Sequence, residues 1–541
     1  MNRRRFLQLA VMGSAPALAV NRSLAADASA ELSRPPDSFR IKPFELEEAT
    51  IADLQKTMKS RKETAVSLAK KYLERIEEVN RRGPTLRAVL EINPDALAIA
   101  RELDRERRAN GPRSPLHGIP VLIKDNIDTH DRMMTTAGSL ALMGSIPARD
   151  SFVARQLRSA GAVILGKCNL SEWANFRGDH SSSGWSGRGG QTQNPYALDR
   201  NPSGSSSGSA VAVAANLCAA AIGTETDGSI ISPSAVCGIV GVKPTVGLVS
   251  RAGIIPIAHS QDTAGPMART VTDAALLLGA LTGADPRDPA TESSADNARP
   301  DYTAFLDLDG LRGARLGVAR AFFRSGGRAG KLLEVALEEM KIQGAIVIDP
   351  ADDPPLGKFG DSEGEVLHYE FKADLNAYLA SLGPHVPVRT LQQVIEFNER
   401  NRDRELQFFG QETLIKAQEK GPLSDAGYLD ALEKCRRMSR AEGIDAVMNA
   451  HRLDAIVAPS GGPAGKTDLI YGDRNVGGSS SPAAVAGYPN ITVPAGQVFG
   501  LLVGISFFGR AYSELILFKI AFSFEQAIHA RRPPKFFTTI S

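Results

Sequence analysis

Two serine-rich loops and one lysine are the residues of this chain whose types and spacing could support chemistry. The first loop, 203–209, reads Ser-Gly-Ser-Ser-Ser-Gly-Ser, and the second, 223–229, reads Gly-Thr-Glu-Thr-Asp-Gly-Ser. Upstream of both, Lys124 ends an apolar stretch. Burial at the end of an apolar strand disfavours the charged form of a lysine, and an uncharged lysine can accept a proton from a serine hydroxyl. Together these parts predict acyl transfer that needs no histidine.

Each part taken alone has a less specific interpretation. Lys124 could be a surface lysine or the ion-pair partner of Asp125. Serine loops are often linkers or phosphate-binding loops, but the first loop opens into an Ala/Val helix and lacks a Gly-Lys-Ser/Thr ending. Ser206 lies at the centre of a Gly-x-Ser-x-Gly pattern, which in a Ser-His-Asp enzyme follows a buried strand. Here turn-forming residues precede the pattern, which argues against that alternative.

Composition narrows the class of protein. The 541 residues are 43% hydrophobic and 23% charged, as in a globular protein, and the formal net charge is +2. No long basic run follows the first residues, so we predict no nucleic-acid partner. The eight histidines are scattered without metal-binding spacing, so we predict no metal site. The four cysteines are Cys168, Cys218, Cys237 and Cys435. An exported protein could pair them, but we favour buried free thiols.

The first 26 residues resemble an export signal of the twin-arginine type. Arg3, Arg4 and Arg5 precede a mostly apolar stretch, 6–20, and small residues follow it at 23–26. We therefore expect a periplasmic or secreted protein with no membrane contact after cleavage, and an uncleaved membrane anchor is the alternative. No other stretch reaches the about 18 apolar residues of a membrane span.

Alternating patterns between about 116 and 280 predict a parallel or mixed β-sheet covered by helices, which is an α/β fold. From about 330 to 450 the pattern is mostly helical, and we expect a helical cap inserted into the α/β body. Thr270 and Thr390 each begin a helix-capping pattern. The expected strands are 121–123, 162–165, 219–222, 239–242, 455–459 and 490–494, and the expected helices include 65–79 and 513–530.

The motifs in combination resemble the amidase signature family. The segments that carry the resemblance are Gly118-Ile119-Pro120, Lys124-Asp125, Gly204-Ser205-Ser206, Gly228-Ser229-Ile230, Cys237-Gly238 and the Gly-Val-Lys-Pro-Thr run at 241–245. The resemblance covers about 45–535. Within the family the chain is most similar to bacterial peptide amidases, on the stretches 171–178, 223–230 and 260–267.

The resemblance implies a fold and a set of site residues. It implies a central mixed sheet with helices on both faces, and an amidase domain at 46–535 that follows a tail at 27–45. Ser229 corresponds to the acylated nucleophile, and Lys124 to the terminal base. Ser205 corresponds to the bridging serine, after a cis peptide bond at Gly204–Ser205. The implied oxyanion donors are the backbone N–H groups of Thr226, Asp227, Gly228 and Ser229, and the implied acyl-pocket segment includes Trp173 and Phe176.

One position departs from the family pattern. The family usually has Gly-Gly-Ser at the nucleophile, whereas this chain has Asp227 before Gly228. Aspartate has the same backbone N–H group as glycine, so the oxyanion donor at position 227 is retained. The Asp227 carboxylate either biases substrate choice or caps a helix that begins near Ser229, and we favour the cap because acidic groups suit helix N-termini.

The resemblance implies a serine amidohydrolase that releases ammonia from carboxamides through an acyl-enzyme on Ser229. Similarity to peptide amidases favours C-terminal peptide amides as substrates. A general amidase for small, aryl or fatty amides is one alternative. Another is an amidotransferase subunit that passes ammonia to a partner in a tRNA-dependent complex, which the export signal argues against. No metal or organic cofactor is implied, and the sequence leaves the oligomeric state open.

Overall fold

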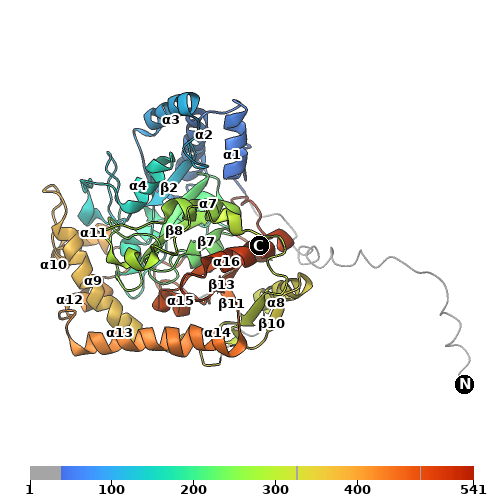
Figure 1. Ribbon diagram of the computed structural model, residues 1–541. Coiled ribbons are helices and arrows are strands. Elements are labelled where there is room, and N and C mark those ends of the chain that lie inside the picture. The colour runs from blue at the N-terminus through green and yellow to red at the C-terminus, as the bar shows by residue number, and fades with distance from the viewer. Residues whose placement is uncertain (1–37, 40, 324–326, 352, 475–476, 541) are drawn as a thin grey trace, which may run out of the picture.

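Strands that are far apart in the sequence pair into one sheet of eleven strands, in the order β1-β3-β2-β6-β8-β7-β12-β13-β11-β9-β10 (Figure 1). The computed structural model describes residues 38–39, 41–323, 327–351, 353–474 and 477–540, so the predicted export signal lies outside the described residues. Parallel and antiparallel pairs both occur, so the sheet is mixed, as the sequence predicts. The strands of this sheet are β1 (Val89–Ile92), β2 (Pro120–Lys124), β3 (Val163–Cys168), β6 (Ala220–Glu225), β7 (Val240–Lys243), β8 (Thr263–Ala268), β9 (Arg315–Val318), β10 (Ile346–Ile348), β11 (Ala455–Gly461), β12 (Asn490–Val498) and β13 (Leu501–Phe508).

Helices cover both faces of the sheet, which confirms the α/β class. A small separate sheet pairs β4 (Trp185–Ser186) with β5 (Gly190–Gln191). The helices are α1 (Ile51–Lys59), α2 (Ala65–Arg75), α3 (Ala96–Asn110), α4 (Phe152–Ser159), α5 (Ser207–Ala214), α6 (Ile231–Val236), α7 (Val271–Leu281), α8 (Gly327–Ile342), α9 (Ser362–Ala380), α10 (Leu391–Arg400), α11 (Arg402–Glu405), α12 (Glu412–Gln418), α13 (Ala426–Ser439), α14 (Asp445–His451), α15 (Ser481–Ala486) and α16 (Glu514–Ile528). Within the described residues, none of them has both the length and the apolar composition to cross a membrane.

Local sequence signals account for many of these elements. Each predicted strand overlaps an observed one, and the predicted helix at 65–79 forms α2 and a π-helical turn after it. Thr270 and Thr390 accept the N–H groups three residues ahead, at 3.1 and 3.2 Å, so both predicted caps are confirmed. All four cysteines are buried free thiols, as expected.

The hairpin of β12 and β13 places the last two long strands in the sheet. Its turn consists of Phe499 and Gly500, whose φ angles are 52° and 77°. Positive φ at both turn residues matches the right-handed twist of the flanking strands. The two strands stay paired from Val498 opposite Leu501 to Asn490 opposite Phe508.

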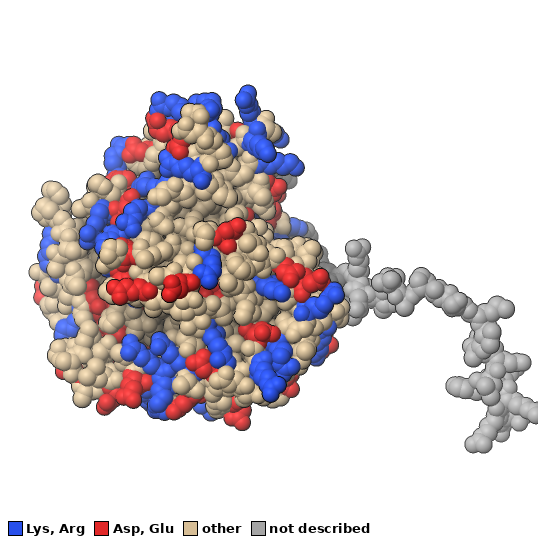
Figure 2. Space-filling model, viewed as in Figure 1, with Lys and Arg blue, Asp and Glu red and all other residues tan. Residues whose placement is uncertain are grey.

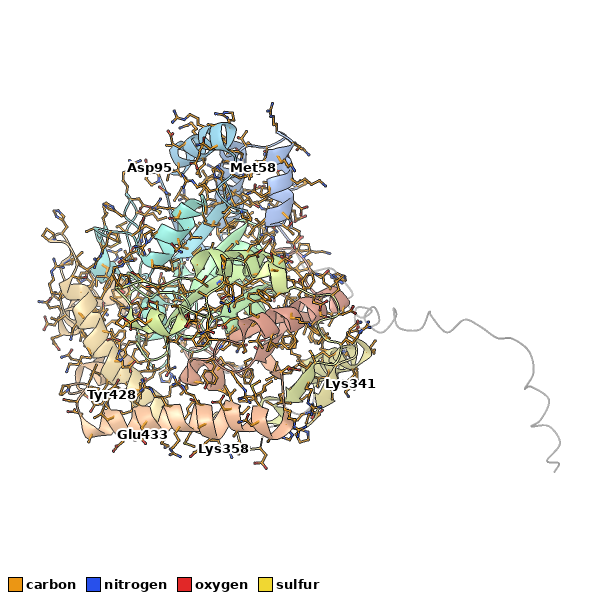
Figure 3. The ribbon with its side chains drawn as sticks, viewed as in Figure 1. Met58, Asp95, Lys341, Lys358, Tyr428 and Glu433 are labelled. Carbon is orange, nitrogen blue, oxygen red and sulfur yellow. The ribbon has the colours of Figure 1, made fainter. Side chains whose placement is uncertain are left out.

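A mostly helical lobe lies against the sheet between α8 and β11. Strand β10 joins the sheet as a parallel neighbour of β9, so the lobe begins only after it. We call α9–α13 the helical cap; it lies at the left and lower edge of Figure 1. Figure 3 shows Tyr428 and Glu433 of the cap at the end of the molecule opposite Met58 of α1. Side chains of the cap share an apolar cluster with the body, in which Phe371 and Leu375 join Leu170 and Ile255.

Strand β8 lies at the centre of the sheet although no sequence pattern predicts it. It reads Thr-Ala-Gly-Pro-Met-Ala, and glycine and proline are both rare in central strands. It pairs with β6 on one side and β7 on the other. A methyl group at Gly265 would overlap the carbonyl oxygen of Val242, so glycine is required by the close approach of the two backbones.

Replacing Gly265 by alanine should therefore destabilise the protein by about 3 kcal/mol, because backbone atoms must move to admit the methyl group. The thermal midpoint of the purified variant measures the loss. Gly427→Ala in α13 is the matched control, since an added methyl there meets nothing within 4 Å, and it should not lower the midpoint. Equal midpoints for the two variants would contradict the packing argument.

Candidate active site

Lys124 and the two serine loops meet at the end of the neighbouring strands β2 and β6. Strands β2 and β6 are parallel neighbours, so Lys124 at the end of β2 lies beside the loop that follows β6. The first serine loop leads into α5, which packs against β6. The backbone N–H of Ser206 donates to the carbonyl of Ser229 at 3.0 Å, and this bond joins the two loops.

The amine of Lys124 lies among hydroxyl and carbonyl oxygens. Its Nζ is 2.8 Å from Ser205 Oγ, 3.0 Å from Ser206 Oγ, 2.9 Å from Thr224 Oγ1 and 3.2 Å from the Thr224 carbonyl oxygen. Asp125 does not pair with Lys124, because its carboxylate contacts Arg188. Lys124 is fully buried, so the structure contradicts both of the less specific interpretations, a surface lysine and an ion pair.

This environment changes the protonation of the lysine. Burial lowers the pKa of Lys124 to about 7, and the negative charges of Asp262 and Glu225 oppose that change from further away. A substantial fraction of the amine is therefore neutral near pH 7 and can accept a proton. Contact with a hydroxyl and a pKa near neutrality are the two requirements for a general base.

The two serines differ in their access to solvent. Ser205 is fully buried and follows a cis peptide bond at Gly204–Ser205, where the resemblance places one. Its carbonyl accepts the N–H of Ser171 at 3.1 Å. Ser229 is 7% exposed, and its hydroxyl has no hydrogen-bond partner among the described residues. Of the three residues Lys124, Ser205 and Ser229, only Ser229 has any exposed surface.

The second serine loop ends in four successive backbone N–H groups that have no acceptor among the described residues. The N–H groups of residues 226–229 donate to no other group in the described part of the chain. The next two, of Ile230 and Ile231, both donate to the Glu225 carboxylate, at 2.7 and 2.9 Å. Burial raises the pKa of Glu225, while Lys243 and these two N–H groups favour its charged form. Glu225 therefore fixes the end of the loop and leaves the four preceding donors free.

Gly228 is required by the conformation of this loop. Its φ is 75°, a region that glycine adopts without strain. A Cβ at this position would also lie 2.9 Å from Ser480 Oγ. The backbone conformation of the loop at this position therefore depends on the absence of a side chain.

Asp227 does not cap α6, so the interpretation favoured from the sequence is wrong. Glu225 occupies the N–H groups at the start of that helix instead. Asp227 Oδ2 accepts the hydroxyl of Ser481 at 2.5 Å, and burial together with the charge of Asp227 raises the pKa of Glu363 in the helical cap. The physical reason is that Glu225, at the end of β6, reaches the N–H groups at the start of α6, whereas Asp227 lies inside the loop.

The predicted pocket residues Trp173 and Phe176 lie between the body and the helical cap. Trp173 is buried in the shared apolar cluster, and the ring of Phe176 packs 4.9 Å from Phe371 and 5.4 Å from His368. The residue of this segment that lines the nearby cavity is Ala174. The two aromatic side chains therefore hold the segment against α9.

A cavity of about 180 Å³ adjoins the site, and Asn126, Thr224, Thr226 and Ile255 are among its lining residues. Asn126 Nδ2 donates to Thr224 Oγ1 at 3.0 Å, and the same hydroxyl contacts Lys124. The buried Asn126 Oδ1 has no partner among the described residues. Polar groups that adjoin the lysine thus reach an open space.

Sequence reasoning missed the side chains that hold the second serine loop. Thr226 Oγ1 donates to Asp262 Oδ1 at 2.5 Å, and Asp262 Oδ2 accepts the N–H groups of residues 257 and 258. Gln261 Nε2 donates to the Thr226 carbonyl at 3.3 Å. The one sequence signal for these residues is the stretch 260–267, which contributes to the family resemblance.

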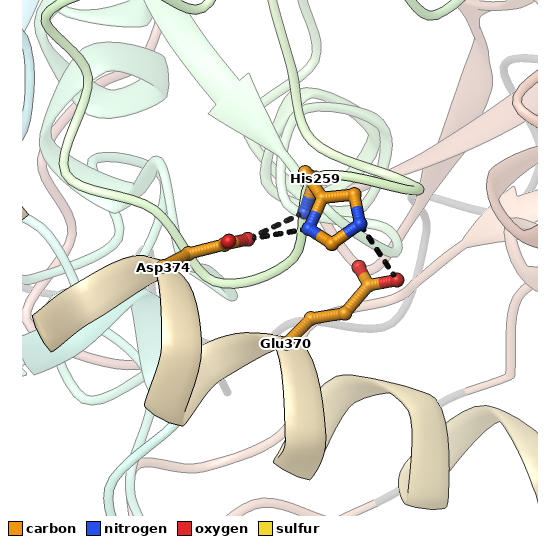
Figure 4. A group of neighbouring side chains, drawn as sticks. All are labelled: His259, Glu370 and Asp374. Atoms are coloured by element: carbon orange, nitrogen blue, oxygen red, sulfur yellow. Dashed lines mark hydrogen bonds and ion pairs between the residues drawn. The ribbon is translucent and has the colours of Figure 1, made fainter. Parts of the chain in front are cut away.

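The helical cap is attached to this neighbourhood through His259 (Figure 4). His259 Nδ1 is 2.9 Å from Asp374 Oδ2, and Nε2 is 3.4 Å from Glu370 Oε1. The hydrogen bond to Asp374 and the charge of Glu370 raise the pKa of His259, while burial opposes the change. Ligand atoms of the three side chains all lie within 4.8 Å, but carboxylates already engage both ring nitrogens, which is the arrangement of an ion pair. The absence of a metal from the mechanism stays a prediction.

Charged side chains are spread over the face of the molecule shown in Figure 2, with lysine and arginine interspersed among aspartate and glutamate. Over that face no single-sign patch of the kind that binds a phosphate backbone is seen. The expectation that this chain has no nucleic-acid partner stays a prediction.

Comparison with known proteins places these features in a family. The family model described as Amidase matches residues 67–518. A probable amidase of Arabidopsis thaliana is 45% identical over 502 residues, which are 91% of this chain and 92% of the relative. The X-ray structure of native peptide amidase from Stenotrophomonas maltophilia is 51% identical, with a TM-score of 0.85 over 91% of this chain and 100% of that one. A component of the glutamyl-tRNA(Gln) amidotransferase of Thermoanaerobacter pseudethanolicus is 35% identical over 501 residues, 90% of this chain and 97% of its own.

A serine-directed sulfonyl fluoride should modify Ser229, because Ser229 is partly exposed whereas Ser205 is fully buried, and the Ser206–Ser229 backbone hydrogen bond holds its loop next to the serines that contact Lys124. Peptide mass spectrometry locates the adduct. In Lys124→Met the labelling rate should fall by at least about 100-fold, since the base is lost. The exposed Lys341→Met is the control and should label at the original rate. Labelling of Ser206 instead, or an unchanged rate in Lys124→Met, would contradict the assignment.

Proposed function

The chain belongs to the amidase signature family and acts on amide C–N bonds, and from this premise we propose that it hydrolyses C-terminal peptide amides to peptides and ammonia. The observation that carries the proposed chemistry is the buried amine of Lys124, whose pKa burial lowers to about 7 and which lies 2.8 Å from the hydroxyl of Ser205. The observation that supports the substrate is 51% identity to a peptide amidase over 91% of this chain.

The first half of the reaction forms an acyl-enzyme. The neutral amine of Lys124 takes the proton of the Ser205 hydroxyl, and Ser205 takes the proton of Ser229. The Ser229 oxygen attacks the carbonyl carbon of the amide, and the carbonyl oxygen becomes an oxyanion. The free N–H groups of residues 226–229 supply preorganised donors for this charge, and their effect is stronger in a site that excludes water.

Collapse of the tetrahedral intermediate breaks the C–N bond. Ser205 returns a proton to the departing nitrogen and regains one from the Lys124 ammonium, so ammonia leaves rather than an amide anion. Water then attacks the ester on Ser229 by the same relay and releases the carboxylic acid. Every proton in this sequence moves between side chains of the chain itself, the substrate and water.

A general amidase for small, aryl or fatty amides shares this chemistry and is the second candidate. Its support is the match to the Amidase model and to the Arabidopsis relative, neither of which specifies a peptide. A role within an amidotransferase has the support of the relative from Thermoanaerobacter. The arginine-rich, apolar N-terminus favours an exported hydrolase, and we propose that the mature protein works in the periplasm or outside the cell.

The reaction rate should depend on pH through Lys124. Because the neutral amine is the base, kcat/KM should decline below about pH 7, approaching tenfold per pH unit as the amine becomes protonated. The profile is measured with an N-acetylated dipeptide amide that has no ionisable group. A rate that stays constant down to about pH 4 would contradict a lysine base with this pKa.

Mass spectrometry of the products tests the substrate class. A peptide amide should exchange its terminal NH2 for OH, with release of ammonia, while the internal peptide bonds of the same molecule stay intact. An aryl amide and a fatty amide of similar length serve as comparison substrates. Turnover of these amides without any change in a peptide amide would favour the general amidase, and release of ammonia only with an added partner would favour the amidotransferase.

A further inference from the structure

Asp262 lies opposite Thr226, the first of the four residues whose backbone N–H groups are free. Strands β6 and β8 are antiparallel, and Glu225 at the end of β6 pairs with Thr263 at the start of β8. The residues one step beyond that pair, Thr226 and Asp262, therefore come side by side. Thr226 Oγ1 donates to Asp262 Oδ1 at 2.5 Å. The register of the sheet thus brings a carboxylate against the loop that ends in Ser229.

The second oxygen of Asp262 closes the turn that carries it. Asp262 Oδ2 accepts the N–H groups of Ile257 and Ala258, at 2.8 and 3.0 Å. The N–H of Asp262 donates back to the carbonyl oxygen of Ala258 at 2.9 Å. A carboxylate can accept from a hydroxyl and two N–H groups at once, since all three are donors. Both oxygens of Asp262 are therefore engaged, and the carboxylate is fixed in one orientation.

Gln261, the neighbour of Asp262, holds Thr226 at a second atom. Its Nε2 donates to the carbonyl oxygen of Thr226 at 3.3 Å and to Glu363 Oε1 of the helical cap at 3.1 Å. Two consecutive residues thus bind the hydroxyl and the carbonyl oxygen of Thr226. The N–H of the same residue has no acceptor among the described residues. Bonds at two points of Thr226 limit the rotation of its backbone and so fix the direction of this free donor.

Helix α9 of the helical cap holds the turn that carries Asp262. Glu370 accepts the N–H of Ser260 at 2.9 Å, and Asp374 accepts the N–H of His259 at 3.0 Å. The imidazole of His259 lies between the same two carboxylates. The turn is therefore fixed by the cap before Asp262 in the sequence and by strand β8 after it.

We propose that Asp262 is a positioning residue for amide hydrolysis, which fixes Thr226 and with it the loop whose free N–H groups receive the oxyanion. The proposal rests on the acyl-transfer chemistry proposed above. Donors that are in place before the reaction stabilise the transition state without a cost of reorganisation. Loosening this loop should therefore slow the chemical step and leave binding of the intact amide almost unchanged.

Two substitutions at Thr226 test the contact in the whole protein, at pH 8, where most of Lys124 is neutral. Thr226→Val keeps the shape of the side chain but removes the hydroxyl, so kcat should fall at least about tenfold while KM changes by less than about twofold. Thr226→Ser keeps a hydroxyl for Asp262, and its kcat should stay within about threefold of the original. Thr303→Val is the matched control, because Thr303 Oγ1 also donates to an aspartate, Asp301, at 2.5 Å in an exposed turn. It should leave both constants unchanged.

A double variant separates positioning from direct contact with the substrate. Thr226 also lines the cavity beside Lys124, so a bond from its hydroxyl to the substrate is the competing explanation. In Asp262→Asn the amide oxygen can still accept the N–H groups of residues 257 and 258, but the charge-assisted bond from Thr226 is lost, and kcat should fall at least about fivefold. If both residues act through one bond, the double variant should match the slower single variant to within about twofold.

Effects that multiply in the double variant overturn the proposal, as does a Thr226→Ser enzyme as slow as Thr226→Val. Circular dichroism shows whether each variant is folded. If Asp262→Asn does not fold, the KM of Thr226→Val decides, because loss of a substrate contact raises KM with kcat unchanged, and that result also overturns the proposal.

The kinetics are recorded on whichever amide the enzyme hydrolyses. Failure to hydrolyse peptide amides would count against the proposed substrate alone, because the ratios of kcat among the variants on a simple amide still report on Asp262.

Discussion

The site depends on burying an amine without an ion-pair partner. The charged form of Lys124 would be costly in this position, and hydroxyl and carbonyl oxygens cannot offset that cost as a carboxylate would. Lys243 shows the alternative: it is also fully buried, but Glu225 and Glu514 act on it, and its pKa falls only to about 8. Burial among hydroxyl and carbonyl oxygens is therefore what brings the pKa of Lys124 near neutral pH.

Strand β6 keeps the Glu225 carboxylate away from Lys124, because side chains alternate between the two faces of the strand. Successive side chains of a strand point to opposite faces, so Thr224 and Glu225 serve different parts of the site. Thr224 contacts the amine of Lys124, while Glu225 takes the N–H groups of Ile230 and Ile231. A slip of one residue in the pairing of β6 would put a carboxylate beside the lysine and remove the anchor of the loop.

Sequence reasoning was sufficient where the signal is local. Apolar runs predicted the strands on either side of the site, and the motif resemblance located Lys124, Ser205 and Ser229. The sequence does not predict strand β8, because this strand contains a glycine and a proline, which are rare in strands. The glycine is required by the close approach of the neighbouring backbone. The role of Asp227 is not predicted correctly, because its partner, the hydroxyl of Ser481, comes from a helix far along the chain. Contacts of this kind have no periodicity to be recognised in a sequence.

The sheet and the helical cap hold different parts of the site. Lys124 and its partner Thr224 lie on the neighbouring strands β2 and β6, where backbone pairing fixes their separation. The loop that carries the free N–H groups has contacts with the cap as well, through Glu363 and Gln261. Changes in the cap can therefore alter how the loop is held without moving the base.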